Sequence, residues 1–224
     1  MRKGERRKQE LVDAATALFF SRGYEETSVN DILDAVGCSK GSFYHHFESK
    51  MDLLAQIARE RAAAGFEAFS AGGGEESPAQ RLNRLLHQAC PIRQGEERFL
   101  GNLLQLMRSR ESAALEQALL EATDELFYPA FLSAVAGLDE EGAGPDETAC
   151  FLIWQGFLNG CMLILRQAAV VPLAGRARSI QLLRALRAQV ESALYLPYGS
   201  LVIIEAEEMA GALENALGQP GPLA

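Results

Sequence analysis

Apolar residues recur at helical spacing from the start of the chain. Within residues 5 to 22, one face of the predicted helix carries Leu11, Ala14, Ala15, Leu18 and Phe19. Similar spacing continues through most of the sequence, whereas no stretch alternates convincingly between apolar and polar residues as a half-buried strand does. Alanine and leucine, which favour helices, are abundant. The pattern therefore predicts an all-α fold.

Capping signals predict the boundaries of these helices. A serine precedes each of the next four helices, and an acid or glutamine three residues later completes a typical helix start in most of them. The serines are Ser28, Ser39, Ser49 and Ser77, and the helices after them span about residues 29–36, 40–47, 50–69 and 78–90. Further helices are expected at about 96–109, 111–135, 146–168 and 177–195, and a last amphipathic segment at 205–217.

A glycine-rich break, SAGGGEESP at residues 70–78, separates two groups of helices. We expect a first domain over residues 1–50, a connecting helix over 51–70, a second helical domain over 71–217 and a flexible tail over 218–224. The glycine run at 72–74 is expected to leave the far end of the connecting helix free to move.

The second and third predicted helices, joined by the tight turn GCS, fit a helix-turn-helix. Gly37 can adopt the positive φ that such a turn needs. The apolar side chains of this unit would face the first helix, so its polar residues face outward: Lys40, Gly41, Ser42, Tyr44, His45 and His46. Such a helix enters the major groove of DNA, where base edges are read. Lys50 can meet a phosphate together with the first amides of the next helix.

Two other interpretations of this stretch stay open. It can be an ordinary three-helix packing unit whose charges are simply solvated. The adjacent histidines can also be metal ligands, but neighbouring residues on a helix point about 100° apart and cannot easily share an ion. We therefore expect no metal and no cofactor.

The distribution of charge agrees with a DNA-binding end. The chain has 224 residues and a net charge of −9, which alone argues against binding a polyanion. Its four lysines, however, all lie within the first 50 residues: Lys3, Lys8, Lys40 and Lys50. Residues 61–224 hold twelve arginines against twenty acids. Basic charge is therefore concentrated at the end that carries the helix-turn-helix.

Other classes of protein are less well supported by the sequence. The most apolar run, residues 149–165, contains Gln155 and Asn159 and falls short of the roughly 18 apolar residues of a membrane span, so we expect a buried helix. The charged N-terminus is not followed by the apolar segment of a signal peptide. The four cysteines lack CxxC spacing, which favours a reducing compartment.

The segment LVDAATALFFSRGYEETSVNDILDAVGCSKGSFYHHFESKMDLL resembles the N-terminal signature of the tetracycline-repressor family of transcriptional regulators. The resemblance covers about residues 7–60 and departs from the family pattern only slightly, at Cys38 and Leu33. It implies an all-helical, bacterial and cytoplasmic homodimer that binds double-stranded operator DNA, with a variable C-terminal domain for a small-molecule effector and for dimerisation. By resemblance, Lys40, Gly41, Ser42 and His45 would meet bases, Thr27, Tyr44, His46 and Lys50 would meet phosphates, and Ser39 and Asn30 would also belong to the DNA-binding surface.

The second domain offers candidates for two further sites. An effector cavity needs apolar walls and a few polar groups, for which the candidates are His87, Leu103, Met107, Arg108, Phe127, Phe131, Trp154 and Phe157. Most such residues are ordinary core residues in helical proteins. A dimer contact is expected on the helices that contain Gly156, Gly160, Leu183 and Leu186. Gln155, Asn159 and Arg166 form a polar seam that can face either the ligand or the second subunit.

Three alternatives to a ligand-controlled regulator remain. Cys90 and His87 can form a nucleophile and base on one helix, but no orienting group accompanies them, so we do not expect an enzyme. Oxidation of Cys38 in the DNA-binding turn can control a redox-sensing regulator. A protein partner can replace the small ligand.

Overall fold

The structure is a computed structural model that describes residues 3–92, 97–108, 112–138, 144–170 and 175–218. Throughout these residues the regular structure is helical. The helices are α1 (Lys3–Arg22), α2 (Val29–Val36), α3 (Lys40–Tyr44), α4 (Lys50–Ala71), α5 (Pro78–Ala89), α6 (Glu97–Leu106), α7 (Ser112–Ala136), α8 (Glu147–Val170), α9 (Gly175–Ala193) and α10 (Ala206–Gly218). The prediction of an all-α fold is confirmed.

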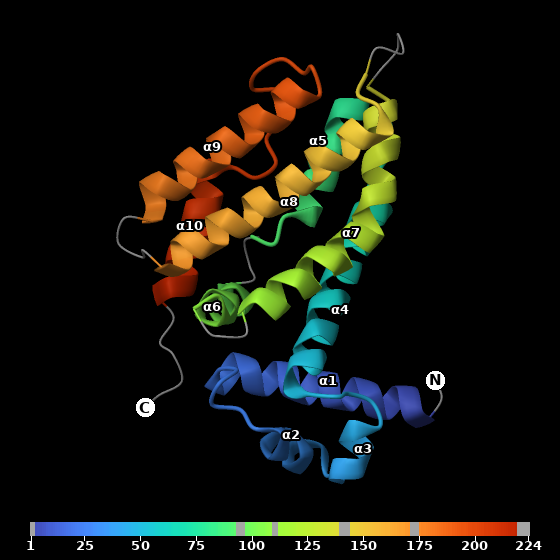
Figure 1. The fold of residues 1–224 in the computed structure, drawn as a ribbon, viewed down its shortest axis with the longest axis vertical. Coiled ribbons are helices and arrows are strands. Elements are labelled where there is room, and N and C mark those ends of the chain that lie inside the picture. Colours follow the sequence, from blue (N-terminus) through green and yellow to red (C-terminus); the bar gives the residue numbers. More distant parts are fainter. Residues whose placement is uncertain (1–2, 93–96, 109–111, 139–143, 171–174, 219–224) are drawn as a thin grey trace.

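The arrangement has two parts that α4 joins. Helices α1, α2 and α3 lie together at one end of the molecule, and α4 runs from them into the remaining helices (Figure 1). There α4 packs along α7, α5 packs on both, and α8 lies against α9. Helix α10 fills the space beside α6 and α9. Of the predicted tail, residues 219–224 lie outside the described residues.

Capping explains why the helices begin where they do. Ser28 and Ser77 each form a reciprocal capping box, and Pro78 occupies the first turn of α5. Helix α3 is shorter than expected and ends at Tyr44. After it, the amide of His46 donates to the carbonyl of Phe43 at 2.8 Å, which tightens the chain into a turn before α4.

The far end of α4 is held in place. Gly72 caps this helix, but the guanidinium of Arg84, from α5, donates to the carbonyl of Phe69 and stacks 4.6 Å from the Phe69 ring. Arg84 also pairs with Glu76, and its hydrogen bond lowers the pKa of that carboxyl. The glycine run therefore does not leave the end of α4 unattached, which corrects the expectation from sequence.

Helix α8 runs through the core of the second part. Trp154, Phe157 and Leu165 are fully buried, and α8 has the length and hydropathy of a membrane span, with 44% of the apolar window buried. A core helix of a water-soluble domain can have the same length and hydropathy. The packing of α8 against α7 and α9 accounts for the apolar residues on its inner sides.

The packing of α8 on α9 corrects the predicted dimer contact. A Cβ at Gly160 would collide with the side chain of Leu186, and one at Gly156 would lie 3.1 Å from Nε2 of Gln189. Leu183 and Leu186 are buried within the same chain. The two half-buried glycines thus allow α9 to approach α8 closely inside one subunit. Of the four predicted contact residues, Leu183 and Leu186 are used up by this packing and are not exposed to a second subunit.

Candidate DNA-binding surface

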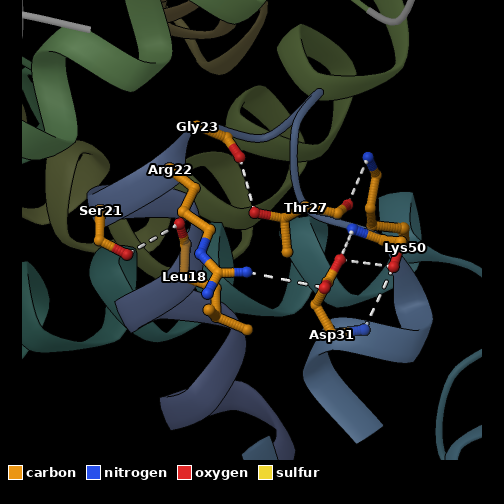
Figure 2. Close-up of polar contacts among 8 residues, drawn as sticks. Leu18, Ser21, Arg22, Gly23, Thr27, Asp31 and Lys50 are labelled. Atoms are coloured by element: carbon orange, nitrogen blue, oxygen red, sulfur yellow. Dashed lines mark hydrogen bonds and ion pairs between the residues drawn. The ribbon is translucent and has the colours of Figure 1, made fainter. Parts of the chain in front are cut away.

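The start of α2 is fixed by a capping box (Figure 2). The amide of Ser28 donates to Oδ2 of Asp31 at 2.7 Å, and the amide of Asp31 donates to Oγ of Ser28 at 3.2 Å. The hydrogen bond from the Ser28 side chain is the main reason that the pKa of Asp31 is lowered. Arg22, at the end of α1, lies 3.6 Å from the same carboxylate. The capping box fixes where α2 begins, and the exposed ion pair adds one contact between α1 and α2.

The turn between α2 and α3 depends on Gly37. Its φ of 65° lies in the left-handed region, and its amide bonds to the carbonyls that end α2. The amide of Cys38 then donates to the carbonyl of Leu33 at 3.1 Å. Ser39 caps α3 by accepting from the amide of Ser42. The chain thus passes from α2 to α3 through a turn of three residues, Gly37 to Ser39, which gives the predicted helix-turn-helix.

Helix α3 presents a polar face to solvent. Its one fully buried side chain is Phe43, which packs against Phe47 with ring centres 5.9 Å apart. The predicted DNA-contacting residues that are exposed are Asn30, Ser39, Lys40, Gly41, Tyr44 and His45, while Ser42 and His46 are half-buried. Tyr44 is 58% exposed although it is aromatic. Six of these eight residues are thus open to solvent and two are partly so, and their contacts with DNA stay a prediction.

His46 lies where this surface meets α1. Its ring is 4.9 Å from that of His45. Partial burial, followed by the positive charges of His45, Lys8 and Arg7, lowers the pKa of His46. These basic residues of α1 extend the cationic surface beyond α3, and a phosphate placed beside them would favour the charged form of His46.

Two residues that were expected to meet phosphates, Thr27 and Lys50, bind the loop between α1 and α2 instead of standing free, with Thr27 buried and Lys50 half-buried. Thr27 is fully buried, and its hydroxyl donates to the carbonyl of Gly23 at 2.7 Å. The ammonium of Lys50 donates to the carbonyl of Thr27 at 3.0 Å (Figure 2). It also donates to the carbonyl of Tyr24 at 2.7 Å and lies 3.9 Å from the centre of the Tyr24 ring. The Thr27 hydroxyl therefore faces the interior, and the phosphate contacts of both residues stay a prediction. Lys50 ties the start of α4 to the loop between α1 and α2.

We expect Lys50→Met to lower the free energy of unfolding by about 1.5–3 kcal/mol, because it leaves two carbonyl oxygens without their charged donor. Lys40→Met is the matched control: Lys40 is exposed on α3, so the same change should alter stability by no more than about 0.5 kcal/mol. Urea denaturation followed by circular dichroism measures both. Equal stability of the two variants would show that Lys50 points outward in solution.

Most of the predicted effector residues are core residues. Trp154 donates from Nε1 to Asp124 at 2.7 Å, and Phe131 and Phe157 pack around it. Nδ1 of His87 lies 2.9 Å from the carbonyl of Ile203, so this histidine holds the segment before α10. Met107 is buried, whereas Arg108 is exposed to solvent and does not face the interior.

Two small cavities lie along α4, and one of the predicted effector residues lines each of them. The first has a volume of about 30 Å³ and is lined by residues of α1, α4, α6 and α7 that include Leu103. The second has a volume of about 20 Å³ and is lined by residues of α4, α5, α7 and α8 that include Phe127. Its polar residues are Arg61, Gln88 and Thr123, none of which the sequence singled out. Cavities of this size hold about one or two waters.

Two residues of the polar seam on α8, Gln155 and Arg166, bind side chains of α7, while Asn159 is exposed and bonds within α8. The side chain of Gln155 donates to Asp124 at 3.1 Å, Asn159 donates to the carbonyl of Gln155 at 2.8 Å, and Arg166 pairs with Glu116. Next to this seam, the outer side of α8 carries exposed apolar side chains that the sequence did not identify: Phe151, Leu152, Leu163 and Val170. Because α8 is apolar on nearly all sides, periodicity alone could not separate this outer face from the core.

Comparison with known proteins identifies the family of this chain. A family described as "Bacterial regulatory proteins, tetR family" matches residues 11–57. The HTH-type transcriptional repressor DhaR of Mycobacterium sp. (strain GP1) is 31% identical over 158 residues, which cover 66% of this chain and 79% of DhaR. This chain belongs to the tetR family.

Other tetR-family members resemble it in part or in fold. The HTH-type transcriptional repressor KstR2 of Rhodococcus jostii (strain RHA1) is 49% identical over 53 residues, but these span only 26% of KstR2 and 24% of this chain. The crystal structure described as a putative TetR-family transcriptional regulator from Syntrophomonas wolfei superposes with a TM-score of 0.57 at 17% identity, covering 86% of this chain and 97% of that one. The sequence likeness to KstR2 is therefore confined to about a quarter of the chain, whereas that to DhaR and the fold likeness extend over most of it.

Proposed function

We propose that this protein is a transcriptional repressor that binds a near-palindromic operator as a homodimer and is released by a small-molecule effector. The observation that carries the proposal is the polar face of α3, where Lys40, Ser42 and His45 are presented on a rigidly capped helix. DhaR and KstR2 are both named as repressors, which supports repression of transcription rather than activation. Because its proposed target is operator DNA, we also propose that the protein acts in the cytoplasm.

Dimerisation is supported by the outer face of α8. Leu152 is 66% exposed, Val170 is 69% exposed and Leu163 is 44% exposed. These residues lie on the face opposite the one that packs on the core, so a second copy can cover them without disturbing the subunit. We propose that α8 and α9 of two subunits form this contact. A palindromic operator follows from the two-fold symmetry, with half-sites about one helical turn apart or a multiple of it.

Effector control is supported by the second cavity, because α4 forms one of its walls. Arg61 lines this cavity, donates to the carbonyl of Pro91 at 2.9 Å and stacks 4.2 Å from the Phe99 ring. A ligand of ordinary size needs about 300 Å³ or more, so it must enlarge the cavity by moving its walls. Since Ala58 lines both cavities, a displacement at Arg61 and Phe99 can join them. Such a displacement moves α4, which carries the helix-turn-helix.

The proposal is tested by selecting DNA sites from a random pool with the purified protein, and then placing the selected site in a reporter promoter. We expect a near-palindromic consensus and reduced transcription when the protein is present. Lys40→Ala or His45→Ala should relax preference at particular base pairs, whereas Tyr44→Phe should weaken binding to all sequences alike. Binding without sequence preference, or a reporter that the protein activates, would contradict the proposed repressor.

A further inference from the structure

The first of the two cavities lies at the joint between the two parts of the molecule. Helix α6 lies next to α1, and α4 leaves the DNA-binding end beside them (Figure 1). On one side the cavity is bounded by Phe19 of α1 and by Tyr24, which follows that helix. On the other side it is bounded by Leu103 and Leu106 of α6 and by Leu115 of α7. Its walls therefore come from both parts.

The walls of this cavity are almost entirely apolar. Phe19 and Tyr24 are buried, with their ring centres 5.1 Å apart. No charged side chain occurs among the lining residues that the structure describes, and besides Tyr24 the polar ones are Thr16 and Asn102. The hydroxyl of Thr16 donates to the carbonyl of Val12 within α1 at 2.7 Å. A charged ligand would find no partner charge there, whereas apolar cavities in proteins take up uncharged molecules such as xenon and benzene.

The second cavity differs in both position and chemistry. Its described lining residues come from α4, α5, α7, α8 and the residue Pro91, and they include the charged side chain of Arg61. Ala58 is the one described lining residue that the two cavities share. A ligand of the second cavity therefore reaches the DNA-binding end only through α4, whereas a ligand of the first cavity contacts α1 directly.

We propose that the first cavity is a binding site for a small uncharged apolar molecule, such as a short hydrocarbon, that holds the DNA-binding end against the second part. Its volume of about 30 Å³ corresponds to one or two waters, so the cavity as it stands takes a molecule of only a few atoms. The site is complete only while α1 lies against α6. A bound molecule therefore stabilises that arrangement by mass action.

The packing behind α6 shows which walls of the cavity can move. A Cβ at Gly101 would lie 3.0 Å from the carbonyl oxygen of Ala216, so the backbones of α6 and α10 are in close contact. Helix α6 is thus backed by α10, and α1 and α4 are the walls that can be displaced from it. If an effector tilts α4 as proposed above, the molecule in the first cavity opposes that effector. This last step alone rests on the proposed function.

The first experiment uses xenon, a single apolar atom, and the full-length protein with isotope-labelled methyl groups. NMR spectra are recorded at increasing xenon pressure. We expect saturable shifts at the methyl groups of Leu103, Leu106 and Leu115, and much smaller ones at Leu119 and Leu158, which line the second cavity. Leu103→Phe should remove the shifts because the larger side chain fills the space. Shifts that do not saturate, or that are largest around the second cavity, would overturn the proposal.

Leu103→Ala keeps the test valid even if the filled variant does not fold. Removing buried methyl groups leaves a larger cavity, so this variant should bind benzene but not benzoate, which has the same ring and a charge. At a benzene concentration ten times its Kd, hydrogen exchange that requires α1 to separate from α6 should be about tenfold slower. Exchange in α9 should be unchanged.

Leu158→Ala is the matched control, because it enlarges the second cavity instead. Benzene should not slow exchange in α1 of this variant. Benzoate that binds the Leu103→Ala protein as tightly as benzene would contradict the apolar ligand class. Unchanged exchange in α1 at saturating benzene would contradict the role of the site in joining the two parts. These measurements use neither DNA nor an effector of the second cavity, so their failure leaves the proposed repressor untouched.

Discussion

Leu163→Arg is expected to convert the protein into a monomer and to weaken operator binding on the order of 10²–10⁴-fold, the range by which linking two binding modules commonly exceeds one module. Leu163 lies on the outer face of α8 and is 44% exposed in the isolated chain. A guanidinium there would be buried against an apolar surface of the second subunit, where a charge without a partner is strongly unfavourable. The fold of each subunit should hardly change, because the side chain already faces solvent.

Light scattering gives the assembly state, and titration of the selected operator at a fixed salt concentration gives the affinity. Leu163→Met keeps an apolar side chain of similar size, so it should remain dimeric and bind normally. A Leu163→Arg protein that is still dimeric would place the subunit contact on another face. A monomer with full operator affinity would contradict the need for two half-sites.

The second large effect is expected inside the helix-turn-helix. Phe43→Ala should destabilise it by about 3–5 kcal/mol, the usual cost of truncating a buried phenylalanine. Phe43 is fully buried and contacts the rings of both Tyr44 and Phe47. Its loss removes the main apolar contact by which the short α3 is held on the rest of the domain. Hydrogen exchange should therefore become faster in α2 and α3, and operator binding should be lost.

Tyr44→Ala is the matched control, since it removes the neighbouring aromatic ring. Tyr44 is 58% exposed, so stability should change by no more than about 0.5 kcal/mol while DNA affinity falls. Trp154 fluorescence should be unchanged in both variants under native conditions because it lies in the second part of the molecule. Equal destabilisation by the two changes would mean that α3 is rotated relative to the structure described.

The sequence was most informative where local chemistry determines structure. Ser28 with Asp31 and Ser77 with Gln80 predicted helix starts that the structure confirms as capping boxes. Gly37 predicted the left-handed turn. These signals act within a few residues, so they can be read without knowing the fold. Together with amphipathic spacing they were enough to predict the order of the helices and their approximate bounds.

Features that depend on which helix faces which could not be predicted in the same way. Gly156 and Gly160 indicated a close helix contact, but only the fold shows that the neighbour is α9 of the same chain. The direction of Lys50 depends on the path of the loop before α2, which the sequence does not determine. Trp154 and Phe157 have the composition of a ligand pocket and are part of the core, because pocket walls and core helices use the same residues.

The attachment of Lys50 to the loop before α2 makes α4 a lever for the DNA-binding end. Its 22 residues give a helix about 33 Å long, with the Lys50 contacts at one end and the Arg84 contacts at the other. If α4 pivots about the Arg84 end, a tilt of about 6° displaces the Lys50 end by about 3.4 Å, the rise of one base pair. Because Lys50 is hydrogen-bonded to the loop before α2, this motion would move the helix-turn-helix as one body. A tilt too small to disturb the core would then be enough to shift the recognition helix of one subunit by one base pair along its operator.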